Sequence, residues 1–146
     1  MGDSGIIEVR PAESADDLAA AYQLVYRSYR RYGLIDPNSS EMHLSLFQAL
    51  PKSATFIGRV RQDIAGTVSV VPDSQMRLPL DQIYSDELQK LRDSGLTIAE
   101  VTKLADRRRN LRRRMPLLTK LMKLVLDYSR FILEADELCI AVHPDH

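Results

Sequence analysis

The pattern that most constrains the fold lies in the last third of the sequence. Residues 97–105 form an apolar, β-rich run with one internal carboxylate, Glu100. In residues 117–134 the polar side chains fall three or four positions apart in an otherwise apolar stretch, which is typical of a helix with one narrow solvated stripe. Residues 137–142 form a second apolar run. Strand, helix and strand in this order predict a parallel crossover unit, because neighbouring parallel strands are usually connected through a helix.

The rest of the sequence adds strands and helices in an order that predicts an α/β layer fold. Proline, glycine and capping residues mark most of the boundaries, for example Pro11 after the first strand and Gly33 after the first helix. The predicted elements are a strand at 6–10, a helix at 15–32, a short helix at 41–50, strands at 55–61 and 66–71 joined by a loop at 62–65, and a helix between Pro79 and Gly95. A length of 146 residues fits one domain, residues 1–146, with a core of its own.

Composition favours a soluble globular protein. Hydrophobic residues make up 45% and charged residues 27% of the chain, and no apolar run is long enough to span a membrane. The first residues lack the basic and apolar regions of a signal peptide, so we expect a cytoplasmic location. The single cysteine, Cys139, lies in an apolar run, where we expect a packing thiol and no disulfide framework.

Positive charge is concentrated in residues 107–114, which hold six arginines. Because the formal net charge of the whole chain is zero, the remainder carries an equal negative charge. Such a run can be a solvated surface, a nucleic-acid patch, or a site for an anionic partner. The absence of interleaved aromatic residues makes nucleic acid the weaker interpretation. Six like charges in eight residues repel one another and usually mark contact with an anion.

Three segments of the chain resemble a known superfamily. They are Gly66-Thr-Val-Ser-Val-Val-Pro72, Leu78-Pro-Leu-Asp-Gln-Ile-Tyr84 and Ala99-Glu-Val-Thr-Lys-Leu-Ala105. In this order they resemble the Gcn5-related N-acetyltransferase superfamily (the GNAT fold), and within it the long-chain N-acyl amino acid synthases. The acyl-homoserine lactone (autoinducer) synthases are more distant relatives.

The resemblance implies an α/β (α+β) fold with a mixed sheet and helices on both faces. It also implies an acyltransferase that moves a long-chain acyl group from acyl carrier protein, or from acyl-CoA, to the amine of an amino acid, without a permanently bound cofactor. One alternative is an autoinducer synthase, which uses S-adenosylmethionine and typically carries tryptophans that this chain lacks. Another is a non-catalytic module that binds carrier protein or RNA through its arginines.

Glu100 is the best candidate for a catalytic residue. An amino acid arrives largely as an ammonium ion at neutral pH, so N-acyl transfer needs a group that accepts a proton. A carboxylate in the middle of a buried strand has a raised pKa, which suits that task. The alternative is a structural carboxylate paired with Lys103 or an arginine. The resemblance further implies a site role for His143, at the close of the last strand.

The donor site follows from the resemblance as well. It assigns the backbone of Leu104, Ala105 and Asp106 to the phosphopantetheine arm and the arginine run to its phosphate: Arg107, Arg108, Arg109, Arg112, Arg113 and Arg114. Acetyltransferases of this superfamily hold coenzyme A with a glycine-rich loop. The corresponding run here has no glycine, so arginine side chains must supply the anion contacts, which favours a carrier protein.

Aromatic and apolar side chains are available for the substrates. Tyr22, Tyr26 and Tyr29 share one face of the first predicted helix, and an apolar acyl tunnel could be lined by Phe56, Val68 and Val70 together with these tyrosines. The alternative for each is packing in the core.

The three histidines give weaker signals. His43 falls in the predicted short helix without an evident partner, and the closing His-Pro-Asp-His sequence makes a poor metal site, so no metal is predicted. Members of the family continue with a further helix and strands after this point. We therefore expect the domain to be truncated at its C-terminus.

Overall fold

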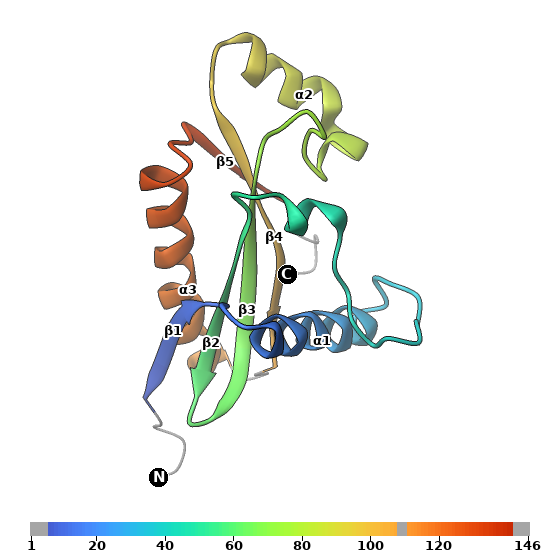
Figure 1. Ribbon diagram of the computed structural model, residues 1–146, viewed down its shortest axis with the longest axis vertical. Helices are drawn as coiled ribbons and strands as arrows, with labels where there is room; N and C mark the ends of the chain where they lie inside the picture. The colour runs from blue at the N-terminus through green and yellow to red at the C-terminus, as the bar shows by residue number, and fades with distance from the viewer. Residues whose placement is uncertain (1–5, 108–110, 142–146) are drawn as a thin grey trace.

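The protein folds around a five-stranded mixed sheet (Figure 1). The computed structural model describes residues 6–107 and 111–141, and the side chains of 111–114 are not among the described parts. The strands are β1 (Ile7–Pro11), β2 (Ala54–Val60), β3 (Asp63–Pro72), β4 (Ile98–Asp106) and β5 (Glu137–Ile140). They lie in sequence order across the sheet, antiparallel except for the parallel pair β4 and β5. This confirms the predicted mixed sheet and the crossover unit.

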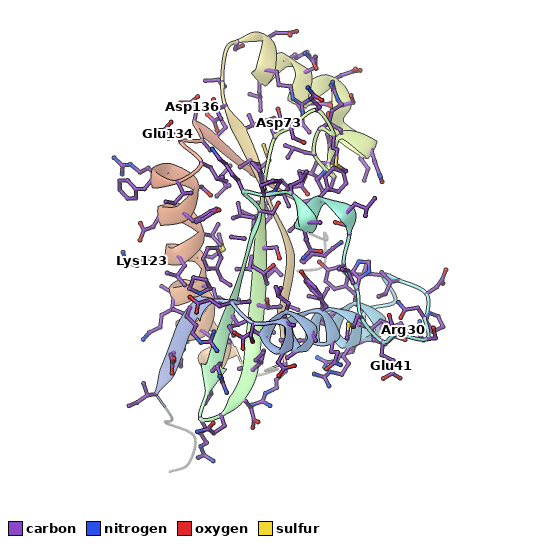
Figure 2. The ribbon with its side chains drawn as sticks, viewed as in Figure 1. Arg30, Glu41, Asp73, Lys123, Glu134 and Asp136 are labelled. Carbon is purple, nitrogen blue, oxygen red and sulfur yellow. The ribbon has the colours of Figure 1, made fainter. Side chains whose placement is uncertain are left out.

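Helices cover both faces and one end of the sheet (Figure 1). Helix α1 (Ala15–Arg31) packs across β2, β3 and β4 on one face, and α3 (Leu111–Phe131) packs across β1 to β4 on the other. Helix α2 (Asp81–Asp93) lies beyond the ends of β3 and β4, near the labelled Asp73 (Figure 2). The arrangement agrees with the α/β layers that the sequence predicts.

Helix α1 begins and ends at the predicted signals. The Ser14 hydroxyl accepts a hydrogen bond from the backbone N–H of Asp17 at 3.0 Å, which caps the first turn. Asp17 also pairs with Arg10 of β1 at 2.6 Å, and this contact fastens the helix to the edge of the sheet. Gly33 follows the helix with a φ of 70°, a left-handed conformation that glycine adopts without strain.

Helix α3 packs closely on the sheet because two strand positions carry no side chain. Leu117, Leu121 and Val125 are fully buried and lie four residues apart, on one line of the helix. Leu117 lies over Gly58 of β2 and Gly66 of β3. A Cβ atom on Gly66 would lie 2.9 Å from a methyl carbon of Leu117, and one on Gly58 would overlap the other methyl group of the same leucine. The glycines therefore set the distance between α3 and the sheet.

The predicted limits of the long helix were wrong at both ends. Helix α3 starts at Leu111, so Pro116 lies inside it, not at its first position. Arginine and leucine are good helix formers and offset part of the cost of an interior proline, which removes one backbone hydrogen bond and crowds the carbonyl four residues earlier. The helix ends at Phe131, three residues before the predicted 134, and Glu134 has a φ of 52°. That left-handed residue turns the chain towards β5.

Two other predicted boundaries also need correction. The predicted helix at 41–50 is only a 3₁₀ turn, η1 (Leu46–Ala49), because the backbone N–H of His43 bonds to the carbonyl of Tyr22 and holds the preceding segment along α1. The predicted loop 62–65 shrinks to two residues, since β3 begins at Asp63. Helix α2 lies within the predicted range, has non-helical φ and ψ at Tyr84, and buries Leu88.

Candidate active site

Within the described residues, strand β4 has two neighbouring strands along its first half and one along its second. Residues 99–101 pair with β3 on one side and with β5 on the other. From residue 102 onward β4 still pairs with β3, whereas in the described part of the chain its pairing with β5 stops at Val101. Backbone groups that alternate along the open half therefore face a gap between the two parallel strands.

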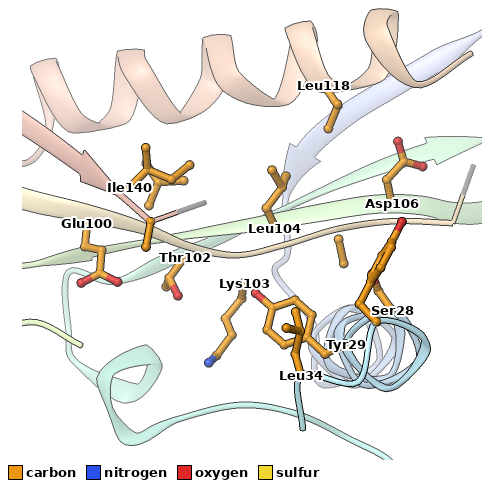
Figure 3. Close-up of a pocket in the computed structure, with 14 residues that line it drawn as sticks. Ser28, Tyr29, Leu34, Glu100, Thr102, Lys103, Leu104, Asp106, Leu118 and Ile140 are labelled. Carbon is orange, nitrogen blue, oxygen red and sulfur yellow. The ribbon is translucent and has the colours of Figure 1, made fainter. Parts of the chain in front are cut away.

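A pocket of about 360 Å³ occupies this gap (Figure 3). Its long wall is β4 from Glu100 to Asp106, and Ile140 marks the end of β5 at its apex. Helix α1 closes one side with Ser28 and Tyr29, and Leu118 of α3 approaches from the other face of the sheet. All three layers of the fold thus contribute to one cavity.

A β-bulge at Lys103 changes which side chains face the same way. The register against β3 shifts between Thr67 and Ser69, and Lys103 has a φ of 57°. In a regular strand Lys103 would lie on the face opposite to Glu100. Figure 3 shows Glu100, Thr102 and Lys103 on one side of β4, with Leu104 on the other. The bulge therefore places a carboxylate, a hydroxyl and an ammonium group in one row.

Glu100 is a buried acid with a raised pKa. Only 3% of the residue is exposed, and burial raises its pKa from 4.5 to about 7. The backbone N–H of Leu80 donates a hydrogen bond to Oε1 at 2.8 Å, which limits the rise because it favours the charged form. Glu100 lines the pocket where β4 and β5 still pair. Near neutral pH it can accept or donate a proton at this position.

An ion-pair network holds the loop that contacts Glu100. Arg92 of α2 donates two hydrogen bonds to Asp73 and two to Asp81, at 2.7 to 3.0 Å. Asp81 in turn accepts from the backbone N–H of Leu78 at 2.7 Å, and these contacts, Arg92 first, lower its pKa to about 2. The network fixes the turn that presents the N–H of Leu80 to Glu100.

Lys103 lies among neutral partners. Its Nζ is 3.1 Å from Nε2 of His43 and 6.0 Å from the centre of the Tyr29 ring. Burial, and then the charge of Lys103, lower the pKa of His43, so its neutral imidazole accepts a hydrogen bond from the ammonium group. Tyr29 and His43 also stack, with ring centres 5.3 Å apart. The expectation that His43 has no partner was therefore wrong.

The predicted donor-binding residues come together, and the predicted acyl-tunnel residues do not. Leu104, Ala105 and Asp106 line the pocket, as does Tyr29. Tyr22 and Tyr26 lie outside it, and the Tyr26 hydroxyl instead accepts a hydrogen bond from the backbone of Asn38. The three residues expected to line an acyl tunnel pack in the closed core beside α3: Phe56, Val68 and Val70.

Most of the arginine run lies outside the described residues. Nothing is described of Arg108, Arg109 and His143, and the side chains of Arg112, Arg113 and Arg114 are likewise not described. Arg107 is described, with Nη1 3.9 Å from the Asp63 carboxylate, and it lines a second groove with Arg27 and Arg59. Asp16, Asp17 and Asp63 line the same groove, so its described arginines face an equal number of carboxylates.

Several pocket residues were missed by sequence reasoning. Thr102, Ser28 and Leu118 carried no signal, because a hydroxyl or a leucine in an amphipathic element is unremarkable. Lys103 was considered only as an ion-pair partner of Glu100, and no carboxylate in the described part of the chain lies within 4 Å of it. The described residues include no cluster of three potential metal ligands.

Among the helices of the described chain, none combines the length and the apolar character needed to span a membrane.

The sheet, the gap beside β4 and the three helices define a GNAT-like acyltransferase fold. Solved structures support this class. LasI, an acyl-homoserine lactone synthase, superposes with a TM-score of 0.60 at 12% identity, covering 86% of this chain and 68% of that one. Glucosamine-6-phosphate N-acetyltransferase from Arabidopsis thaliana superposes with a TM-score of 0.60 at 10% identity, covering 96% and 84%. At these identities the likeness concerns the fold alone.

The amino-acid sequence identifies the protein family within this fold class. Residues 20–146 match the N-acyl amino acid synthase family FeeM, and the chain belongs to this family. FeeM from uncultured soil microbes, described as an N-acyl amino acid synthase, superposes with a TM-score of 0.85 at 26% identity, covering 100% of this chain and 76% of that one. No curated protein matches the sequence. The protein is an N-acyltransferase, and the predicted family, fold and enzyme class are confirmed.

Proposed function

We propose that the protein transfers a long-chain acyl group from a thioester donor to the amine of an amino acid, with Glu100 as the proton acceptor. One observation carries the proposal: a buried carboxylate with a pKa of about 7 lies at the apex of the pocket between β4 and β5. An extended donor arm can lie along the open half of β4 and bring its carbonyl to this apex. Family membership supports the amino acid as acceptor.

The reaction needs two proton movements. The acceptor arrives as an ammonium ion and loses one proton to Glu100, directly or through a water molecule. Its nitrogen then attacks the thioester carbonyl, the C–N bond forms, and the C–S bond breaks as the tetrahedral intermediate collapses. The departing thiolate takes up the second nitrogen proton, and Glu100 releases its own to solvent. The products are an N-acyl amino acid, a free thiol and one proton.

We propose acyl carrier protein as the donor, with acyl-CoA as the alternative. The arginines of residues 107–114 support this choice, because they follow directly on the wall of the pocket and carry no glycine for a backbone phosphate cradle. The positive end of the α3 dipole adds to the same region. Carrier proteins are acidic and meet such surfaces through charge. Because acyl carrier protein is a cytoplasmic donor, we also place the reaction in the cytoplasm.

The test is a direct assay for products. The protein is incubated with long-chain acyl-carrier protein or acyl-CoA and a mixture of amino acids, and N-acyl products are identified by mass spectrometry. We expect an amide product that depends on the acyl thioester and one or a few amino acids. A lactone formed only with S-adenosylmethionine would instead indicate an autoinducer synthase, and no product with either donor would contradict both enzyme functions.

The docking surface has its own test. Reversal of charge in the double variant Arg112→Glu and Arg113→Glu should slow association with the carrier protein about tenfold or more at low salt, and the difference should shrink as salt rises. Reaction with acyl-CoA at saturating concentration serves as the control, since it requires no carrier surface. Equal association rates at low salt would remove the docking surface from the proposal.

A further inference from the structure

We propose that Lys103 binds the α-carboxylate of the acceptor amino acid and thereby orients its amine towards Glu100. This inference rests on the proposed function and assigns a binding group within the same pocket. Lys103 lines the pocket between Thr102 and Leu104. The assignment stands on the position of the ammonium group, on its neighbours and on its alignment with the buried acid.

The backbone pays a conformational cost to place this side chain. Lys103 has a φ of 57° at the bulge of β4, a left-handed conformation that costs a non-glycine residue about 1 kcal/mol. Without the bulge the lysine would point to the α3 face, into the main apolar core. Strained positions of this kind concentrate at binding and catalytic sites. Here the result of the strain is an ammonium group in the pocket.

The ammonium group lacks a close anionic partner in the described part of the chain. Its hydrogen-bond partner is the imidazole of His43 at 3.1 Å, and the Tyr29 ring lies 6.0 Å away. Burial lowers the pKa of Lys103, and the charge of Glu100 opposes that effect without an ion pair shorter than 4 Å. A partly buried cation held by neutral groups favours an incoming anion, because a charge-assisted hydrogen bond restores the lost solvation.

The alignment with Glu100 fits the two charged groups of an amino acid. Glu100, Thr102 and Lys103 project from the same side of β4, and the hydroxyl of Thr102 lies on that side as well (Figure 3). Strand geometry separates the Cα atoms of residues 100 and 102 by about 7 Å. An α-amino acid carries its amine and carboxylate on one carbon atom. When its carboxylate is bound at Lys103, its amine can point along the row towards the proton acceptor.

Carboxylate recognition explains how the pocket can select amino acids from other primary amines. Glu100 takes a proton from any amine and gives no such selection. Lys103, three positions away, provides this selection. An amine without a carboxylate would leave the Lys103 charge unpaired in the complex. The discriminating contact would thus lie in β4 itself, beside the catalytic group.

The experiment compares two acceptors in four proteins: the wild type, Lys103→Met, Lys103→Arg and a control variant. The acceptors are an amino acid used by the wild type and the amine that lacks only its carboxylate. The variant Lys103→Met removes the charge and keeps the length of the side chain. Its control is Lys123→Met, because Lys123 projects from α3 away from the sheet and its side chain is 76% exposed (Figure 2). Each protein is assayed for kcat and KM with both acceptors, and for slow hydrolysis of the thioester without any acceptor.

We expect Lys103→Met to raise KM for the amino acid about 10- to 100-fold, the size of a lost charge-assisted hydrogen bond. KM for the amine and the hydrolysis rate should stay within about twofold, and Lys123→Met should behave like the wild type. Lys103→Arg, which keeps the charge, should recover much of the preference for the amino acid. Equal losses with both acceptors, or an unchanged preference, would overturn the assignment.

Failure of the inference can be told apart from failure of the proposed function. If the wild type acylates neither acceptor, the proposed function itself is wrong. If it acylates amino acids and Lys103→Met keeps the same preference, only the role of Lys103 is wrong. Should the methionine variant not fold, Lys103→Asn replaces it, because asparagine tolerates the left-handed backbone at this position.

Discussion

The two halves of β4 differ in their neighbours, and the difference separates two tasks. Residues 99–101 pair on both sides, and this closed half holds Glu100 at 3% exposure with a pKa of about 7. Among the described residues, 102–106 pair only with β3, and this open half carries the bulge and lines the pocket. A proton acceptor needs rigid, dry surroundings, whereas a donor arm needs free backbone groups. One strand serves both tasks because, in the part of the chain that the structure describes, β5 pairs with β4 only as far as Val101.

The largest effect is expected when the carboxylate of the closed half is removed. Glu100→Gln keeps the shape and the acceptor oxygen for the Leu80 N–H but cannot take up a proton. Turnover should fall about 10²- to 10⁴-fold, the usual contribution of a general base, while affinity for the donor stays unchanged. Single-turnover assays with acyl-carrier protein measure the first quantity, and binding titrations measure the second. Lost donor binding would point to a structural role.

The stability of the same variant is its control. Because burial raises the pKa of Glu100 from 4.5 to about 7, the folded state favours the protonated form. Stability from this group is therefore full below pH 4.5 and is lost as pH rises towards 7. Glu100→Gln should match the wild type near pH 4 and exceed it by about 3 kcal/mol at pH 8. Urea unfolding at the two pH values measures the difference, and a destabilised variant at pH 8 would contradict the buried charge.

A smaller effect is expected when Glu100 is kept and the turn that donates a hydrogen bond to it is destabilised. Arg92→Met breaks both ion pairs that hold the turn around Leu80, and in the described part of the chain it leaves Asp81, whose charge acts on Glu100, with only the Arg77 ion pair at 3.4 Å. Both changes favour protonated Glu100. The acid limb of the pH–rate profile should therefore shift to higher pH by about half a pH unit to one pH unit. Stability should fall by about 2 kcal/mol, less than for a fully buried pair.

The pH shift is the informative measurement for Arg92. A merely structural residue would lower stability and activity without moving the acid limb. Asp127→Asn, which breaks the exposed pair with Lys123, is the matched control and should change neither quantity measurably. An unmoved acid limb in Arg92→Met would show that the network does not act on Glu100.

The smallest effect on chemistry is expected from a change outside both halves of β4. Gly58→Ala adds a methyl group that overlaps Leu117 of α3, so the helix must move and stability should fall by about 1 to 3 kcal/mol. The acid limb should stay in place, because Glu100 lies on the other face of the sheet. Adding Leu117→Val should recover part of the loss in a double-mutant cycle. Strictly additive losses would contradict the contact.

The sequence predicted the closed half of β4 better than the open half. A carboxylate inside an apolar strand signals burial, and the strand-helix-strand pattern signals a parallel neighbour, so Glu100 and the crossover unit were foreseeable. The bulge was not, because nothing local marks Lys103 for a positive φ. Its contact with His43 joins residues 60 positions apart. Apolar residues such as Phe56 suit a core and an acyl tunnel equally well. Only their packing in the folded structure shows which of the two they line.

The central claim is that Glu100 accepts the proton with a pKa of about 7, and the pH dependence of kcat/KM tests it most directly. A base works only when ionised, so wild-type kcat/KM should rise about tenfold per pH unit below the pKa and level off above about 7. Measured with acyl-carrier protein and the preferred amino acid, this inflection should be absent in Glu100→Gln. The same inflection in both proteins, or one near the ordinary glutamate value of 4.5, would contradict the account.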